Sequence, residues 1–339
     1  MPRTARLDAP GVLHHVIIRG IERRKIFWNE ADYEDFLDRL AGLIPETQTT
    51  CLAWVLMTNH AHFLLRAGPD GLSGFMRRLL TGYAVKFNRR HHRHGQLFQN
   101  RYKSILCQED AYLKELVRYI HLNPLRAGMV ESVAQLKDFR YSGHAVIMGN
   151  RKRPWQDSGY VLDQFGGSLR TARKRYLAFV RSGVEQGRRE ELTGGGLIRS
   201  LGGWSEVKRQ RRKKMGRLKG DERILGDSEF VQHTLEQADE ELERRYALAS
   251  RGWDQDKVAR QVASLYNLSP AEIYRKGRQR VRMEARSLFC YWCSRELGLS
   301  LTDIAQSLGM TPAGVGYAVR RGEKLALDGG YRLDGKILK

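Results

Sequence analysis

Hydrophobic and polar positions follow two different spacings in the first part of the chain. Residues 12–19 (VLHHVIIR) are rich in β-branched side chains, which favour extended backbone and predict a strand. Residues 31–43 (ADYEDFLDRLAGL) place their large apolar side chains three or four positions apart, the spacing of one helix face. The chain therefore opens with a strand followed by a helix.

The same two spacings continue to about residue 124. Thr58-Asn59 supplies turn chemistry between two strands, so these strands are expected to form a hairpin. Asn123-Pro124 is expected to end a helix, because proline lacks the backbone N–H. Further strands are predicted at 51–57, 60–66 and 101–107, and helices at 72–90 and 110–122.

The resulting order is βαββαβ followed by a helix. This order predicts an α+β fold of ferredoxin-like type, with a four-stranded antiparallel sheet and helices on one face. The other face of the sheet is expected to stay open as a platform.

The remainder of the chain is expected to be helical. Residues 301–307 and 311–321, joined by a tight turn at 308–310, predict a helix-turn-helix. We expect a first domain at 1–150, a basic helical connector at 151–255, an all-α helix-turn-helix domain at 256–327 and a tail at 328–339.

Charge narrows the class of partner. The formal net charge is +21 and the isoelectric point is about 10.0, which favours binding to a polyanion such as DNA. The chain has no apolar run of about 18 residues, which argues against a membrane partner. No signal-peptide core follows the first residues, so we expect a cytoplasmic, nucleoid-associated protein.

The clearest chemical feature is a pair of histidines with one residue between them. On a strand, His60 and His62 point to the same face and could chelate one divalent ion. The alternative is two half-exposed histidines on a polar face. Tyr119 and Asn123 share one face of the predicted helix, where tyrosine can act as a covalent nucleophile and an amide oxygen suits Mg²⁺ or Mn²⁺. Tyr112 and Tyr102 are competing nucleophiles.

Four stretches, in this order, resemble the HUH single-tyrosine transposases, and more closely their REP-associated tyrosine transposase branch. The resemblance covers about the first 130 residues. It is carried by residues 11–20 (GVLHHVIIRG), 57–64 (MTNHAHFL), 95–104 (GQLFQNRYKS) and 119–130 (YIHLNPLRAGMV).

This resemblance implies a DNA strand-transferring enzyme. It assigns His60 and His62 to the metal, Tyr119 to the nucleophile, and Asn123 to the position where simpler members have a glutamine as third ligand. It further implies cleavage and rejoining of single-stranded or hairpin DNA through a 5′-phosphotyrosine. A homodimer is one option, because the simplest members work as dimers.

The second half carries another resemblance. Residues 258–325 are similar to the DNA-binding domain of the bacterial replication initiator DnaA, notably at 300–308 (SLTDIAQSL), although the initiator's signature at its last helix is absent. Duplex DNA is the implied partner, and a helical domain used for protein contacts is the alternative.

Several basic residues are candidate DNA contacts. Those on the predicted helix 72–90 either form a solvated face or support single-strand binding, and the run at 208–214 is either a linker or a phosphate-binding arm. The candidates are Arg77, Arg78, Lys86, Arg89, Arg90, Lys208, Arg209, Arg211, Arg212, Lys213, Lys214, Thr311, Arg320 and Arg321.

Three function classes stay open at this point. The leading one is a transposase, and the second is a domesticated sequence-specific DNA-binding regulator without cleavage activity. An RNA-binding protein is a third, disfavoured because no strand is rich in aromatic residues. Cys290 and Cys293 have the spacing of half a zinc site, but no further ligands lie nearby, so two packed thiols are favoured.

Overall fold

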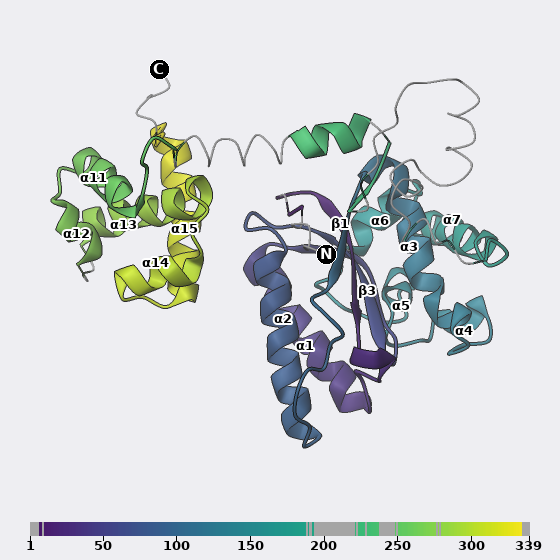
Figure 1. Cartoon of the computed structure of the whole chain (residues 1–339). Helices are drawn as coiled ribbons and strands as arrows, with labels where there is room; N and C mark the ends of the chain where they lie inside the picture. The colour runs from purple at the N-terminus through teal and green to yellow at the C-terminus, as the bar shows by residue number, and fades with distance from the viewer. Residues whose placement is uncertain are drawn as a thin grey trace. The chain divides into compact units, whose positions relative to one another are not determined.

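The computed structural model describes residues 7–333, apart from 9, 188, 190–191, 193–220, 222, 228, 237–247, 249, 276 and 278. The chain forms two compact units, Met1–Thr234 and Leu235–Lys339 (Figure 1). The candidate DNA contacts Lys208, Arg209, Arg211, Arg212, Lys213 and Lys214 lie outside the described residues.

The first unit is built on a sheet with the strand order β2-β3-β1-β4-β5. The first four strands pair antiparallel, which confirms the ferredoxin-like prediction, and β5 adds a short parallel edge beside β4. The strands are β1 (Leu13–Arg19), β2 (Thr50–Leu56), β3 (His60–Arg66), β4 (Lys103–Cys107) and β5 (Ile224–Leu225).

Two long helices cover one face of this sheet, α1 (Glu30–Thr47) and α2 (Ser73–Arg90) (Figure 1). Alternate strand residues such as Val16 and Phe63 pack against them. A capping box formed by Asn29 and Asp32 sets the start of α1. A short 3₁₀ turn, η1 (Ile21–Arg23), links β1 to the segment before α1.

The opposite face is covered as well, so the expected open platform is wrong. Leu64 and Ile105 on that face form one core with Leu116 and Ile120 of a third long helix. The reason is that both faces of the strands are apolar, and an open face would leave these side chains in water. The covering helices are α3 (Glu109–Arg126), α4 (Val133–Leu136), α5 (Gly143–Met148), α6 (Ser158–Asp163) and α7 (Leu169–Ser182).

The predicted division at residue 150 also differs from the structure. Val161 of α6 and Val180 of α7 belong to the same core as Leu64, and β5 extends the sheet itself. The first compact unit accordingly continues past residue 150 instead of giving way to a separate connector.

The helix α3 does not end at Asn123-Pro124, as predicted, but continues to Arg126 with Pro124 inside it. Proline cannot donate the backbone hydrogen bond to the carbonyl of Ile120. Asn123 supplies that donor instead, because its Nδ2 reaches the Ile120 oxygen at 3.3 Å and the Tyr119 oxygen at 3.0 Å. The helix continues for two residues past the proline, to Arg126.

The second unit is all helical in its described residues and has its own core. The turn between α14 and α15 is closed by Gly309 in the left-handed conformation, which confirms the helix-turn-helix. Its elements are α11 (Gln255–Leu265), α12 (Pro270–Tyr274), α13 (Arg280–Tyr291), the π-helical turn η3 (Trp292–Glu296), α14 (Leu301–Leu308) and α15 (Pro312–Gly329).

Cys290 and Cys293 are buried in this second core, as the interpretation of two packed thiols requires. Burial raises the pKa of Cys290 to about 12 and the pKa of Cys293 further, so both thiols are protonated at neutral pH. Among the described helices of the chain, none has the length and apolar character needed to cross a membrane.

A buried polar cluster lies behind α3. The Tyr176 hydroxyl contacts Nδ1 of His121 at 2.8 Å and Nδ1 of His144 at 2.6 Å. Burial lowers the pKa of both imidazoles, that of His144 to about 4. One hydroxyl thus satisfies two neutral rings, donating to one and accepting from the other.

Tyr176→Phe is expected to lower the free energy of unfolding by about 1–3 kcal/mol, because two buried ring nitrogens lose their partner together. Urea unfolding at neutral pH measures this. A loss below about 0.5 kcal/mol would show that the hydroxyl contributes only packing.

Candidate active site

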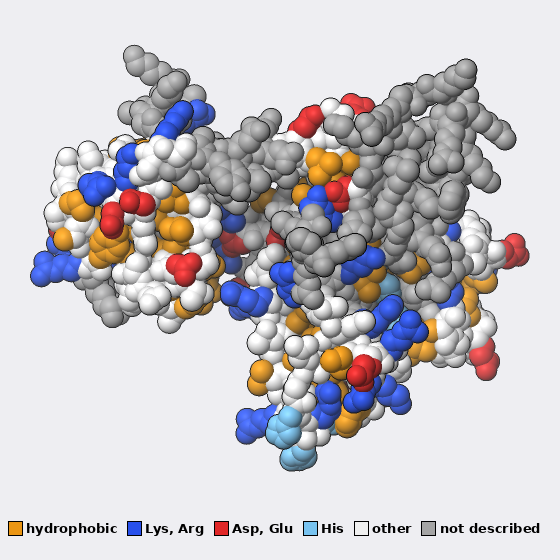
Figure 2. Space-filling view, in the orientation of Figure 1, with side chains coloured by type: hydrophobic (Ala, Val, Ile, Leu, Met, Phe, Trp, Pro, Cys, Tyr) orange, Lys and Arg blue, Asp and Glu red, His pale blue; other side chains and the backbone are white. Residues whose placement is uncertain are grey.

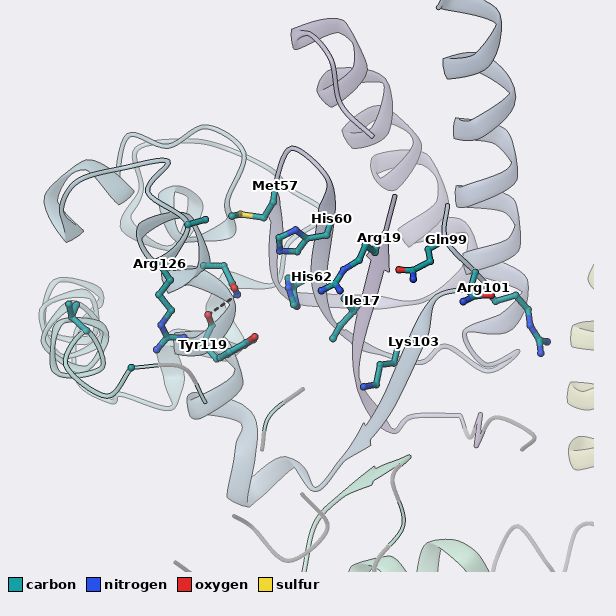
Figure 3. A pocket seen from close by; sticks show the side chains of 15 residues that line it. Ile17, Arg19, Met57, His60, His62, Gln99, Arg101, Lys103, Tyr119 and Arg126 are labelled. Carbon is teal, nitrogen blue, oxygen red and sulfur yellow. Dashed lines mark hydrogen bonds between the residues drawn. The ribbon is translucent and has the colours of Figure 1, made fainter. Parts of the chain in front are cut away.

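A cavity of about 850 Å³ opens on the α3 side of the sheet (Figure 3). It lies between β1, β3, the segment that leads into β4, and the C-terminal half of α3. Its lining includes Ile17, Arg19, Met57, His60, His62, Gln99, Asn100, Arg101, Lys103, Tyr119, Asn123, Arg126, Ala127, Val184 and Gly187.

Strand pairing places both histidines in this cavity. His60 lies opposite Arg19 and His62 opposite Ile17 in the antiparallel pairing of β3 with β1. Alternation along β3 sends Ala61 into the core beneath α1 and α2 and the two imidazoles to the other side. The ring centres are 5.2 Å apart, with His60 half-buried and His62 only 4% exposed.

Both imidazoles are held neutral. Burial and the nearby Arg19 lower the pKa of His60 to about 4. Burial, followed by the neighbouring His15, His60 and Arg19, lowers the pKa of His62 well below its ordinary value. Neutral imidazole is the form that binds a metal ion, so the site keeps this form at neutral pH.

The helix α3 brings the other two predicted residues to the same place. Tyr119 is 9% exposed, and its ring centre is 5.8 Å from that of His62. Asn123 follows one turn later, and because its Nδ2 is bound to the helix backbone, Oδ1 is the amide atom left for a ligand. The competing tyrosines Tyr112 and Tyr102 are not among the residues that line the cavity.

Four cations also line the cavity, Arg19, Arg101, Lys103 and Arg126, and of these Arg101 extends away from the two histidines (Figure 3). Sequence reasoning did not single them out, although each falls within or beside one of the motifs quoted above. Their summed charge suits an anionic ligand such as a phosphodiester.

Arg126 is the most informative of the four. Its guanidinium lies 5.4 Å from the centre of the Tyr119 ring, and Nη2 donates to the Gly183 carbonyl at 3.4 Å. Its buried Nε and Nη1 have no hydrogen-bond partner among the residues that the structure describes. Burial lowers the pKa of this group, with a smaller opposing effect of Tyr119. A half-buried cation with unmatched donors is unfavourable alone, and a bound phosphate would supply the missing acceptors.

The candidate DNA contacts on α2 lie on the other side of the sheet. Three of the five have partners on α1: Arg78 pairs with Glu46, Lys86 with Asp35, and Arg90 with Asp32. These ion pairs join α2 to α1. Contact of Arg77, Arg78, Lys86, Arg89 or Arg90 with DNA therefore stays a prediction.

In the second unit, Thr311 caps α15 by accepting a hydrogen bond from the Gly314 N–H at 3.1 Å. Arg321 donates from Nε to the Ser287 hydroxyl at 2.7 Å. Arg320 stacks over the ring of Tyr317, an exposed aromatic residue that sequence reasoning missed. Lys and Arg side chains are spread over the visible face of both units (Figure 2).

Comparison with known proteins follows this division of the chain. Residues 10–123 match the family of IS200-like transposases. Residues 255–321 match the bacterial DnaA helix-turn-helix family. Both resemblances seen in the sequence are thus confirmed, and the transposase match spans His60, His62, Tyr119 and Asn123.

One solved structure among the matches is described as a REP-associated tyrosine transposase bound to a REP hairpin. It shares 16% identity with this chain, covers 50% of this chain and 93% of its own, and gives a TM-score of 0.37. The comparison with curated proteins found no match.

Arg126→Gln is expected to weaken binding of single-stranded DNA about 10- to 150-fold, since a charge-assisted hydrogen bond contributes about 1.5–3 kcal/mol. It should leave the free energy of unfolding unchanged or raise it, because an unpaired half-buried charge is removed. Fluorescence anisotropy and urea unfolding measure the two effects.

Arg140→Gln is the matched control, because Arg140 is not among the candidate DNA contacts. Glu30 and Glu34 already bind its two terminal nitrogens, each at 3.0 Å, so this change should leave DNA binding almost unaltered. Equal losses of affinity in both variants would contradict a specific role for Arg126.

Proposed function

We propose that the chain is a metal-dependent endonuclease and transposase that cuts single-stranded DNA at hairpin elements and rejoins it through a 5′-phosphotyrosine. One observation carries the proposal. His60, His62, Tyr119 and Asn123 come from two separate elements, and all four line one cavity that cations surround. The match of residues 10–123 to the transposase family agrees with it.

The donors in the cavity suit Mg²⁺ or Mn²⁺. Two neutral imidazoles and the Asn123 amide oxygen offer three ligands. In the described part of the chain, no group of three or more His, Cys, Asp or Glu side chains could hold a metal ion, and the proposal assigns the third ligand to the Asn123 amide. A divalent ion held by these three ligands would supply charge to polarise the scissile phosphate and to offset the negative charge that develops on its oxygens.

The chemistry of the chain's own residues follows from their positions. The Tyr119 oxygen attacks phosphorus and releases its proton to water, and a new bond joins the tyrosine to the 5′-phosphate. The bond from phosphorus to the 3′ oxygen breaks, and that oxygen leaves as a 3′-hydroxyl after gaining a proton. Reversal of the step rejoins a strand without a nucleotide cofactor, since the phosphotyrosine retains the phosphodiester energy.

Arg126 is suited to hold the phosphate during this exchange. Its unmatched donors lie beside the Tyr119 ring, where negative charge develops as the bonds change. In-line attack in a partly enclosed cavity requires a strand that can bend, which favours single-stranded DNA or the foot of a hairpin over a straight duplex.

In this proposal the second unit anchors the protein on duplex DNA. In a helix-turn-helix, the second helix enters the major groove, and here that helix is α15. A homodimer remains a prediction from the family resemblance. The alternative function is a DNA-binding regulator without cleavage, which requires the second unit alone and gives no reason for a tyrosine beside two histidines.

Tyr119→Phe is expected to abolish the covalent adduct, because the attacking oxygen is lost while the ring remains. The measurement is a denaturing gel of protein incubated with labelled hairpin-bearing single-stranded DNA from the region flanking its gene, with Mn²⁺ or Mg²⁺. Wild type should form a metal-dependent adduct.

Tyr112→Phe is the matched control for this experiment and should retain the adduct. An adduct that persists in Tyr119→Phe and disappears in Tyr112→Phe would identify Tyr112 as the nucleophile instead of Tyr119. Absence of any adduct from wild type across these hairpins would favour the regulator.

Arg320→Ala is expected to weaken duplex binding by about 1–3 kcal/mol if α15 reads the groove, and to leave adduct formation on hairpin DNA unchanged. Arg260→Ala removes the same charge from the exposed face of α11 and serves as control. Fluorescence anisotropy with labelled duplex DNA measures the affinity of the two variants. Equal losses of affinity would indicate that duplex binding depends on net charge alone.

A further inference from the structure

Each of the two cavity histidines makes a hydrogen bond through Nδ1, on the side of the ring away from Nε2. His62 Nδ1 contacts His15 Nε2 at 3.0 Å, and His15 Nδ1 contacts the backbone carbonyl of Leu192 at 3.0 Å. His15 is completely buried on β1, and its ring stacks on that of His62 with centres 5.3 Å apart.

The Leu192 carbonyl, at the end of this series of hydrogen bonds, determines which ring nitrogens carry the protons. A carbonyl oxygen only accepts, so His15 carries its proton on Nδ1. Complete burial disfavours a second proton on the His15 ring, so its Nε2 keeps a lone pair and accepts from Nδ1–H of His62. His62 is left with its lone pair on Nε2.

A second series of hydrogen bonds acts on His60 in the same way. Asn59 donates from Nδ2 to the carbonyl of Arg23 at 3.0 Å, which orients its amide. The Asn59 Oδ1 therefore faces His60 and accepts from Nδ1–H at 2.6 Å. His60 also keeps its lone pair on Nε2.

The geometry points to His15 and Asn59 as positioning residues that fix both metal-binding imidazoles with Nε2 available to the divalent ion. Neither residue touches the ion or DNA in this scheme. Outer hydrogen bonds of this kind orient the ring and select its tautomer, and their loss lowers metal affinity by about 10–100-fold. This inference rests on the metal site of the proposed function.

Mn²⁺ binding to the full-length protein, measured by isothermal titration calorimetry without DNA, tests the inference. His15→Leu and Asn59→Ala are each expected to raise the dissociation constant about 10–100-fold. His15→Gln should bind more tightly than His15→Leu, because the glutamine oxygen can still accept from His62 Nδ1–H. An equal loss in the two His15 variants would overturn the assigned role of His15.

His14→Leu is the matched control. His14 is the neighbour of His15 on β1 and is equally buried, but it faces the opposite side of the sheet and contacts the Ser104 hydroxyl at 3.1 Å. Its replacement should leave Mn²⁺ affinity unchanged. A loss as large as that of His15→Leu would mean that any buried change in β1 disturbs the site, and would overturn the inference.

A second readout needs no metal. Two-bond ¹H–¹⁵N correlation spectra of ¹⁵N-histidine-labelled protein distinguish the ring tautomers, with His60→Gln and His62→Gln to assign the signals. Wild type is expected to show both rings protonated at Nδ1, and His15→Leu to lose that signature for His62 alone. Rings protonated at Nε2 in wild type would overturn the inference directly.

The two readouts separate this inference from the proposed function. Failure of wild type to bind Mn²⁺, whatever the tautomers, would overturn the metal-dependent function and with it the positioning role. Normal Mn²⁺ binding by wild type, by His15→Leu and by Asn59→Ala would overturn the positioning role and leave the proposed function standing.

Discussion

The antiparallel pairing of β3 with β1 decides on which side of the sheet the two imidazoles lie. Because strand side chains alternate, a shift of one residue would send His60 and His62 into the core beneath α1 and α2 and bring Ala61 to the cavity. The apolar residues of β3 prevent such a shift, since Phe63 and Leu64 fill cores on opposite faces. Core packing thus fixes the register of β3 and with it the position of the two imidazoles in the cavity.

The same packing explains why the site is enclosed. The helix α3 buries Leu116 and Ile120 against the sheet, and its neighbouring positions Tyr119, Asn123 and Arg126 line the cavity. Its continuation past Pro124 depends on Asn123, whose side-chain amide donates to the carbonyl that proline leaves unpaired. One residue therefore supports the helix and offers its remaining oxygen to the site.

The cavity also concentrates features that oppose stability. It holds neutral imidazoles at low exposure and the half-buried guanidinium of Arg126, whose Nε and Nη1 find no acceptor in the described part of the chain. Such groups favour the bound state over the free one, because a phosphate and a cation would satisfy them. The surrounding apolar cores of both sheet faces compensate for this unfavourable set.

Sequence periodicity alone determined the order of the elements, the ferredoxin-like pairing and the helix-turn-helix, because strand and helix spacings depend on local side-chain direction. His60, His62, Tyr119 and Asn123 were also recognisable, since their spacing places each pair on one face. Tertiary structure alone decided that α3, α6 and α7 close the second face of the sheet, and that Arg126 and His15 join the site. Those contacts link residues that lie far apart in the chain. Such long-range burial and hydrogen bonding produce no periodic pattern of hydrophobic and polar residues, so the sequence alone does not predict them.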